Sequence, residues 1–139
     1  MISINEIMNT ELMTLKSDDS LWDAVNLMNE KKIRHIPIMA GNKLQGLITQ
    51  RDVLKFMYKT EDEQKTIKLA DIMVAQVISV DEDASIRKAA LFLQQHKLGC
   101  LPVMNGEKLV GIVTDTDFVA VAINLLEQVE LSEPLEDDF

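Results

Sequence analysis

An amphipathic stretch followed by two short apolar runs sets the pattern of this chain. Apolar residues recur in the stretch at the i, i+3, i+4, i+7 spacing of one buried helix face, and Ser20 suits the N-cap. The four apolar residues are Leu21, Ala24, Val25 and Met28. The runs at 36–39 and 44–49 predict strands, because the Ala-Gly-Asn-Lys segment between them is typical of a hairpin turn.

Three shorter segments surround this helix and hairpin. Residues 3–9 predict a short helix capped by Ser3, with Glu6 three residues later. Residues 12–15 predict a short strand, and residues 51–58 predict a second helix. The strand, helix, hairpin and second helix together give the order β-α-β-β-α.

The same order recurs 65 positions later without a gap. The second copy has a predicted strand at 77–80, a helix capped by Ser85 and a hairpin of 101–104 and 109–114. Identical pairs are Ser20/Ser85, Ala24/Ala89, Pro37/Pro102, Gly41/Gly106, Lys43/Lys108, Leu44/Leu109, Gly46/Gly111, Thr49/Thr114 and Asp52/Asp117. Chance does not give such a register, so we predict an α+β fold of two β-α-β-β-α repeats.

The length of 139 residues is that of one domain, so we expect the two repeats to share one core. We assign residues 1–58 to the first repeat and 67–126 to the second. Residues 59–66 are polar and predict a linker, and residues 127–139 predict an acidic tail.

The last predicted helix, residues 118–129, is apolar almost all the way round, with Asn124 as the one polar residue before Glu127. A helix that is apolar on every face is buried on every face, and a second subunit is the partner we expect. The alternative is that this helix packs wholly within its own monomer. Beyond Ser132 we expect the acidic end to be disordered.

The net charge of −9 is concentrated at the end of the chain, which leaves −3 for residues 1–126. A nucleic-acid surface is not expected, since phosphate binding requires clustered Lys and Arg. No run reaches the ~20 apolar residues of a membrane span. One cysteine cannot form an internal disulfide, which predicts a reducing, cytoplasmic location.

A Gly-h-h-Thr-x-x-Asp motif, where h is apolar, stands at 46–52 and again at 111–117. Its Thr-x-x-Asp part has the spacing of a capping box, which requires no ligand, and Ser20 with Asp23 shares that spacing where we expect no site. Three features favour a ligand. The glycine leaves room against the backbone, the helix start offers free N–H groups, and aspartate can accept two hydrogen bonds from a vicinal diol.

A second repeated pattern is an apolar residue followed by proline, at Ile36-Pro37 and Leu101-Pro102. Proline has no N–H and holds the preceding residue extended, so we expect each to start an edge strand. The unpaired backbone of such a strand can hydrogen-bond the edge of a base such as adenine. Equally, the proline can simply prevent a sheet edge from pairing with another chain, which requires no ligand.

Together the two patterns and the repeated element order resemble a tandem pair of CBS (cystathionine β-synthase) domains, a Bateman module, over about residues 3–126. The resemblance implies that the repeats pack through their sheets with pseudo-two-fold symmetry and leave two clefts between them. Those clefts commonly take AMP, ADP, ATP or S-adenosylmethionine. Such modules usually form homodimers, which suits the apolar last helix.

The resemblance also implies roles for individual residues. Ribose contacts are implied for Asp52 and Asp117, with Thr49 and Thr114 near the ribose or a phosphate. Base contacts are implied for the main chain around Thr14, Leu15, Ile36, Ser79, Val80 and Leu101, next to Pro37 and Pro102.

The two predicted sites differ in charge. The first repeat places Arg34, His35 and Arg51 beside its motifs, three groups that can meet phosphate. The second repeat has Gly99, Cys100 and Thr116 at the matching positions and an additional carboxylate at Asp115, which disfavours a polyphosphate. We therefore expect a phosphorylated adenosine on the Asp52 side, and a less charged ligand or none on the Asp117 side. We interpret Cys100 as a small buried residue, and the alternative is that its thiol acts as a sensor.

No P-loop, nucleophile elbow or set of metal ligands stands in the sequence, so we expect neither an enzyme nor a metal site. The favoured function is a regulatory module that binds an adenosyl ligand between its repeats and acts on an unidentified partner protein. The alternative is a docking module that dimerises without any ligand.

Overall fold

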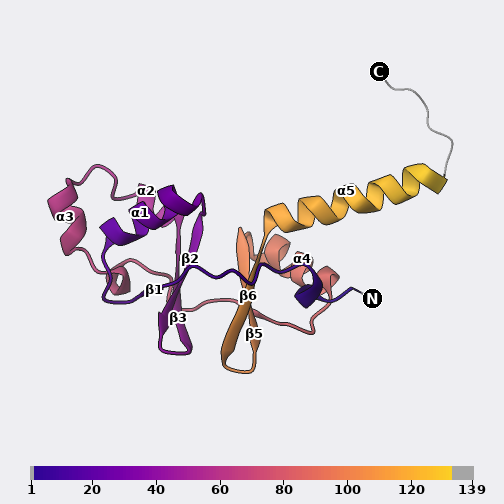
Figure 1. Cartoon of the computed structure of the whole chain (residues 1–139), viewed down its shortest axis with the longest axis horizontal. Coiled ribbons are helices and arrows are strands. Elements are labelled where there is room, and N and C mark those ends of the chain that lie inside the picture. Colours follow the sequence, from indigo (N-terminus) through magenta and orange to yellow (C-terminus); the bar gives the residue numbers. More distant parts are fainter. Residues whose placement is uncertain (1, 133–139) are drawn as a thin grey trace, which may run out of the picture.

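Two three-stranded sheets, each with its own helices, make up the computed structural model, which describes residues 2–132 (Figure 1). Along the chain the elements are η1 (Ile4–Glu6), β1 (Leu15–Lys16), α1 (Leu21–Lys31), β2 (His35–Ala40), β3 (Lys43–Thr49), α2 (Gln50–Leu54), α3 (Glu61–Thr66), η2 (Leu69–Asp71), β4 (Val80–Asp81), α4 (Ile86–His96), β5 (Cys100–Asn105), β6 (Lys108–Thr114) and α5 (Asp115–Ser132). The α+β class and the repeated β-α-β-β-α order are confirmed. Among the described residues, no helix is both long enough and apolar enough to cross a membrane.

Helices α1 and α4 begin as the sequence predicts. Ser20 and Ser85 cap them by accepting hydrogen bonds from main-chain N–H groups, and Ser20 does so within a full capping box with Asp23. Each helix ends at a lysine in the left-handed region, Lys32 at φ 58° and Lys97 at φ 53°. All four apolar positions predicted to face the core from α1 are buried.

The outer strands are shorter than expected. The predicted strands at 12–15 and 77–80 pair only from Leu15 and Val80 onward, because β1 and β4 meet the middle strand at two positions each. Helix α2 is also shorter than the predicted 51–58. Past Leu54 the main-chain N–H of Phe56 reaches only three residues back, to Val53, and the helix gives way to turns.

The polar residues predicted as a linker contain a helix, α3, which the sequence analysis missed. Thr60 and Glu63 form its capping box, and it packs against α1. Gln64 is 4% exposed, and its side-chain amide donates to the carbonyl of Lys59 at 2.9 Å. A polar segment can therefore form a buried contact when one glutamine finds a main-chain partner.

The segments that lead into each repeat cross over to the other repeat. Isolated bridges join Asn9 to Ile112 and Leu47 to Val74, two pairs that match at the 65-residue offset. Ile4 is buried in the core of the second repeat, and Leu69 is buried in the core of the first. Each repeat has its own core, so the single shared core expected from length is wrong, and the crossing segments tie the two cores together.

The sheets meet through β3 and β6, which contact each other. Between them lies a small buried cluster of Leu47, Cys100 and Ile112, flanked by Leu12 and Val77. Leu47 matches Ile112 and Leu12 matches Val77 at the repeat offset, so the cluster lies about the pseudo-two-fold axis. The predicted pairing of the repeats through their sheets is confirmed.

Helix α5 extends away from the body of the molecule (Figure 1). It runs further than predicted, to Ser132, and none of its residues is buried in a single copy. The alternative that it packs wholly within its own monomer is therefore wrong. The first six residues of the predicted acidic tail belong to this helix, and the disorder predicted beyond Ser132 lies outside the described residues.

Candidate functional site

The Thr-x-x-Asp motifs form hydrogen bonds at the starts of α2 and α5. Oδ2 of Asp52 accepts from the main-chain N–H of Thr49 at 3.0 Å and from its hydroxyl at 2.9 Å. Oδ2 of Asp117 accepts from the N–H and hydroxyl of Thr114 at 2.8 and 3.3 Å. The capping interpretation is therefore correct for α2, where the hydroxyl of Thr49 also accepts from the N–H of Asp52 at 3.3 Å.

The capping bonds use only one oxygen of each carboxylate. Among the described residues, no hydrogen bond reaches Oδ1 of Asp52 or Asp117, and both side chains are partly exposed. The cap also fixes the orientation of each carboxylate before any ligand arrives. Each aspartate can thus cap its helix through Oδ2 and accept hydrogen bonds from two neighbouring hydroxyls through Oδ1.

The helix starts offer fewer free N–H groups than expected. The N–H of Gln50 donates to the carbonyl of Arg34 at 2.8 Å, and the N–H of Asp115 donates to the carbonyl of Gly99 at 3.1 Å. With Asp52 bonded to Thr49, the first turn of α2 leaves only the N–H of Arg51 without a partner among the described residues. The expected anion site at this helix end is therefore weak, and charged side chains would have to supply the attraction.

The glycines of the motif leave no room for a ligand, contrary to expectation. A Cβ at Gly46 would lie 2.5 Å from Met73 Sδ and 2.9 Å from the carbonyl oxygen of Val74. A Cβ at Gly111 would lie 2.5 Å from Met8 Sδ and 3.2 Å from the carbonyl oxygen of Asn9. These glycines are required because the crossing segments pass directly over β3 and β6.

The proline strands are central and buried, so the expected edge position is wrong. The sheet orders are β1-β2-β3 and β4-β5-β6, which places β2 and β5 between two neighbours. Ile36 and Leu101 are 0% exposed, and the side chains of Pro37 and Pro102 are fully buried. Proline is tolerated here because β1 starts pairing only at Ile38, so the residues before it have no partner on that side. In this structure none of the four presents atoms at the surface.

The sheet registers bring the remaining predicted residues together within each repeat. His35 lies opposite Thr49, and Cys100 lies opposite Thr114. Leu15 and Val80 lie in the outer strands, and Thr14 and Ser79 directly precede them. Arg34, Arg51 and Thr116 are exposed close to the capped aspartates along the chain. Each repeat therefore places its Thr-x-x-Asp motif and the residues next to it around the C-terminal end of β3 or β6, whereas Leu15 and Val80 pair with the middle of β2 and β5.

The two motifs also meet across the pseudo-two-fold axis. A Cβ at Gly99 would lie 2.9 Å from His35 Nε2, so the imidazole of the first repeat packs on the backbone of the second. Burial lowers the pKa of His35 below 6.5; the charge of Asp115 opposes this shift, and Arg34 adds to it. His35 is therefore mainly neutral at pH 7, and it is a hydrogen-bonding group rather than a fixed positive charge.

Cys100 is buried and unreactive. It is 3% exposed, and burial, assisted by the charge of Asp115, raises its pKa to about 12. A thiol with this pKa is protonated at neutral pH and reacts poorly with electrophiles and oxidants. The interpretation as a small buried residue is the one that this geometry supports.

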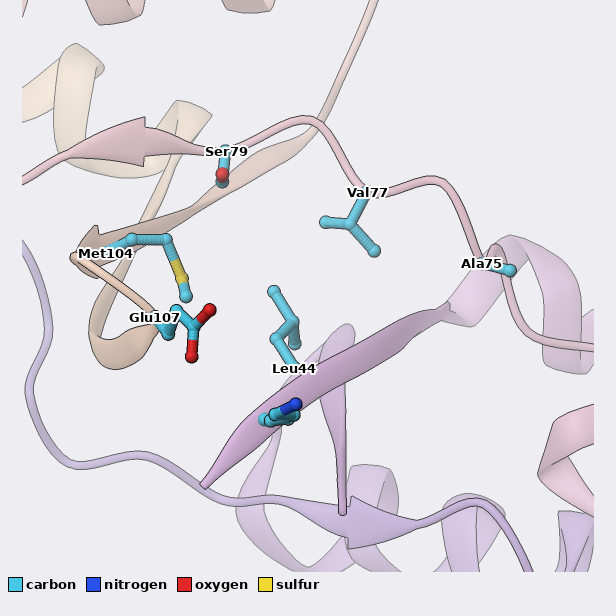
Figure 2. Close-up of a pocket in the computed structure, with 7 residues that line it drawn as sticks. Leu44, Ala75, Val77, Ser79, Met104 and Glu107 are labelled. Carbon is cyan, nitrogen blue, oxygen red and sulfur yellow. The ribbon is translucent and has the colours of Figure 1, made fainter. Parts of the chain in front are cut away.

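A hollow of about 340 Å³ opens between the repeats at their hairpin ends (Figure 2). It is lined by Lys43, Leu44, Ala75, Val77, Ser79, Met104 and Glu107. Its volume lies within the roughly 300–1,000 Å³ usual for small-molecule sites. Of the predicted residues only Ser79 lines it. Lys43 and Glu107 were missed because their Gly-containing turns signalled hairpins and nothing more.

The family model for the CBS domain matches the chain twice, at residues 4–59 and 69–124. These matches cover most of the chain, and the protein belongs to the CBS domain family as a tandem pair.

Three solved structures illustrate the relationship. The chain is 42% identical to the "putative acetoin utilization protein (AcuB)" of Vibrio cholerae, with a TM-score of 0.83 and coverage of 94% of this chain and 98% of that one. It is 25% identical to the CBS domain pair of MJ0100, whose structure contains 5′-methylthioadenosine and S-adenosyl-L-methionine (TM-score 0.81; 90% and 98% covered). It is 26% identical to CBSX2 from Arabidopsis thaliana, in complex with AMP (TM-score 0.78; 91% and 99% covered).

The curated relatives include much longer proteins. The chain is 31% identical over 127 residues to an uncharacterized protein from Thermofilum pendens, and it spans 42% of that protein's length. It spans 22% of the homoserine O-acetyltransferase of Methanococcus vannielii, at 34% identity over 108 residues. The similarity to these proteins concerns the CBS pair, and not the remainder of their chains.

Proposed function

We propose that this chain is a regulatory module that binds an adenosyl nucleotide of the AMP, ADP or ATP type between its two CBS repeats and modulates a partner protein. The observation that carries the proposal is the pair of aspartates, Asp52 and Asp117, each held by a cap through Oδ2 with Oδ1 uncommitted. Two hydroxyls on adjacent ribose carbons can both donate hydrogen bonds to such an oxygen. The adenosyl ligands of MJ0100 and CBSX2 support the same class of ligand.

The phosphates belong on the Asp52 side. Arg34 and Arg51 are exposed there, and both guanidinium groups can pair with phosphate oxygens. On the other side Asp115 adds negative charge, which favours a ligand with fewer phosphates, such as S-adenosylmethionine, or none. We assign the chain no catalytic role, and its cytoplasmic location stays a prediction.

The second candidate is a docking module that forms a homodimer without any ligand. The exposed apolar side chains of α5 favour this function, because large apolar patches on a soluble chain usually mark a contact surface. Ligand binding and dimerisation are compatible, so the first proposal includes the homodimer. The two candidates differ in whether an adenosyl compound binds at all.

Titration calorimetry with AMP, ATP and S-adenosylmethionine tests the proposal. We expect AMP or ATP to bind the wild-type chain, and Asp52→Ala to weaken that binding at least about tenfold, since a hydrogen bond to a charged group contributes about 1.5–3 kcal/mol. Asp117→Ala should leave AMP and ATP binding largely intact.

Asp23→Ala is the matched control, because it removes the same capping box from α1, where no site is proposed. Equal losses from Asp23→Ala and Asp52→Ala would assign the motif to folding alone. If none of the three ligands bound the wild-type chain, the result would favour the docking module.

One similarity indicates where to look for the downstream partner protein. The 42% identity to the AcuB protein of Vibrio cholerae makes acetoin utilisation the process in which we propose to search. Deletion of the corresponding gene should slow growth on acetoin as the carbon source and leave growth on glucose unchanged. Equal growth on both would direct the search elsewhere.

A further inference from the structure

The hollow at the hairpin ends carries opposite charges from the two repeats. Lys43, at the start of β3, borders it from the first repeat, and Glu107, in the turn between β5 and β6, borders it from the second. The carboxylate of Glu107 points across the opening toward Leu44 (Figure 2). Each repeat therefore supplies one charged side chain to the same opening.

The polar side chains around the hollow have no partner in the described part of the chain. The ion pairs found among residues 2–132 involve neither Lys43 nor Glu107. Within the same range no hydrogen bond uses the hydroxyl of Ser79, which also lines the hollow. A ligand can therefore pair with an ammonium group, a carboxylate and a hydroxyl here without breaking an existing contact.

The wall between the two charges is apolar. Leu44, Val77 and Met104 are half-buried and line the hollow. Such side chains can pack against an apolar group, and methionine adapts its shape to the group that it meets. The volume of about 340 Å³ lies near the lower end of the range usual for small-molecule sites, which suits a small metabolite.

The sequence explains why there is space on this side of the molecule. Three residues of the segment that crosses over from the second repeat are each smaller than their counterparts 65 positions earlier. The pairs are Ala75 for Thr10, Val77 for Leu12 and Ser79 for Thr14. The segment therefore fills less of the space beside the hairpins than the larger residues would.

The hollow and the Thr-x-x-Asp motif of the first repeat lie at opposite ends of one strand. Strand β3 runs from Lys43 at the hollow to Thr49 at the motif. A strand rises about 3.3 Å per residue, so these two ends are roughly 20 Å apart. A ligand held between Lys43 and Glu107 is therefore separate from a ribose held at Asp52.

We propose that the hollow binds a small α-amino acid with an apolar side chain, such as leucine, as a second ligand. Its carboxylate pairs with Lys43, its ammonium group pairs with Glu107, and its side chain packs on the apolar wall. A ligand with charges of only one sign is attracted by one of these groups and repelled by the other, so the pair favours a zwitterion over a polyamine or a phosphate. Because the two charges belong to different repeats, the bound amino acid bridges the hairpins.

Titration calorimetry with leucine tests the site. Lys43→Gln and Glu107→Gln should each weaken binding about fivefold or more, the upper end of what an exposed ion pair contributes. Lys108→Gln is the matched control and should bind leucine like the wild type, because Lys108 is the counterpart of Lys43 and does not line the hollow. If none of leucine, valine and methionine bound the wild type at millimolar concentration, the proposal would be wrong.

Truncated ligands test the two charge contacts separately. Isocaproate is leucine without its amino group, and isoamylamine is leucine without its carboxylate. Both should bind more weakly than leucine. Lys43→Gln should weaken only isocaproate further, and Glu107→Gln should weaken only isoamylamine further. Equal responses of both compounds to both variants would contradict the assigned contacts.

Competition with a nucleotide separates this inference from the proposed function, which it goes beyond and does not require. Leucine should still bind when AMP is saturating. Displacement of leucine by AMP would assign the hollow to the nucleotide cleft and overturn the separate site. A chain that binds leucine and no adenosyl compound would overturn the proposed function and leave this inference standing.

Discussion

Gly46 and Gly111 lie where the crossing segments pass over the sheets, and no larger residue fits there. We predict that Gly46→Ala lowers the free energy of unfolding by about 1–3 kcal/mol, the usual effect of overfilling a packed contact. Gly111→Ala should cost less, since its nearest main-chain neighbour is the carbonyl oxygen of Asn9 at 3.2 Å, against 2.9 Å for Val74 at Gly46. Urea unfolding measures both, with the exposed Gln45→Ala as control. A Gly46→Ala protein as stable as the control would contradict the close approach.

His35 makes the fold sensitive to pH at the contact between the repeats. Burial lowers its pKa in the folded state below the ordinary value of 6.5. Well above pH 6.5 the site is neutral in both states and contributes nothing to pH dependence. As the pH falls below 6.5, the unfolded chain binds a proton that the folded chain resists, so stability decreases until the folded-state pKa is passed.

The measurement is the midpoint of thermal unfolding between pH 7.5 and pH 5. His35→Gln should flatten the dependence, and His96→Gln, at an exposed position, should retain it. Identical slopes for wild type and His35→Gln would contradict the assignment.

Single residues were predictable where local chemistry decides them. Ser20 and Thr49 cap helices because a hydroxyl accepts from a nearby N–H, whatever the tertiary fold. The role of Gly46 was mistaken because room for a ligand and room for Met73 look alike in sequence. The burial of Ile36 was missed because the order of strands in a sheet is not a local property.

At the level of elements, the crossing segments decide which core each part of the chain stabilises. Ile4 is buried with the second repeat, although it precedes the first. We predict that Ile4→Ala loosens the second repeat and that Leu69→Ala loosens the first, each by about 2–5 kcal/mol. Hydrogen exchange of β5 and β2 amides separates the two effects. If Ile4→Ala raised exchange in β2 first, the assignment of η1 to the second core would be incorrect.

The element order was predictable because apolar spacing and turn residues repeat in register. The crossing was not, since Ile7-Met8 and Ile72-Met73 occupy matching places whichever repeat they pack on. Helix α3 was missed for a similar reason: its polar sequence lacks an apolar stripe, and its packing against α1 cannot be inferred from the sequence of the segment itself. Long-range contacts of this kind leave no periodic signal.

At the level of the whole molecule, the proposed ligand site and the proposed dimer contact share one helix. Thr114 and Asp117 lie at the first turn of α5, and the exposed apolar side chains of this helix begin at Val119. A ligand that moves this turn changes the direction in which the rest of α5 leaves the body. The ligand can act on the dimer only if it binds the two arrangements with different affinity.

Coupling of this kind must be reciprocal. If an adenosyl ligand changes the dimer dissociation constant by some factor, dimerisation changes the ligand's affinity by the same factor, typically about 5–150-fold. We predict such a shift when the dimer dissociation constant is measured by analytical ultracentrifugation with and without saturating ligand. The shift should be lost in Asp117→Ala, which removes the hydrogen bonds of Asp117 to Thr114 at the start of α5 while Asp52 still binds nucleotide. Calorimetry below and above the dimer dissociation constant measures the factor from the other side. Two equal factors would establish that the module transmits ligand binding through α5, whereas a dimer constant unchanged by ligand would show that binding and assembly are independent.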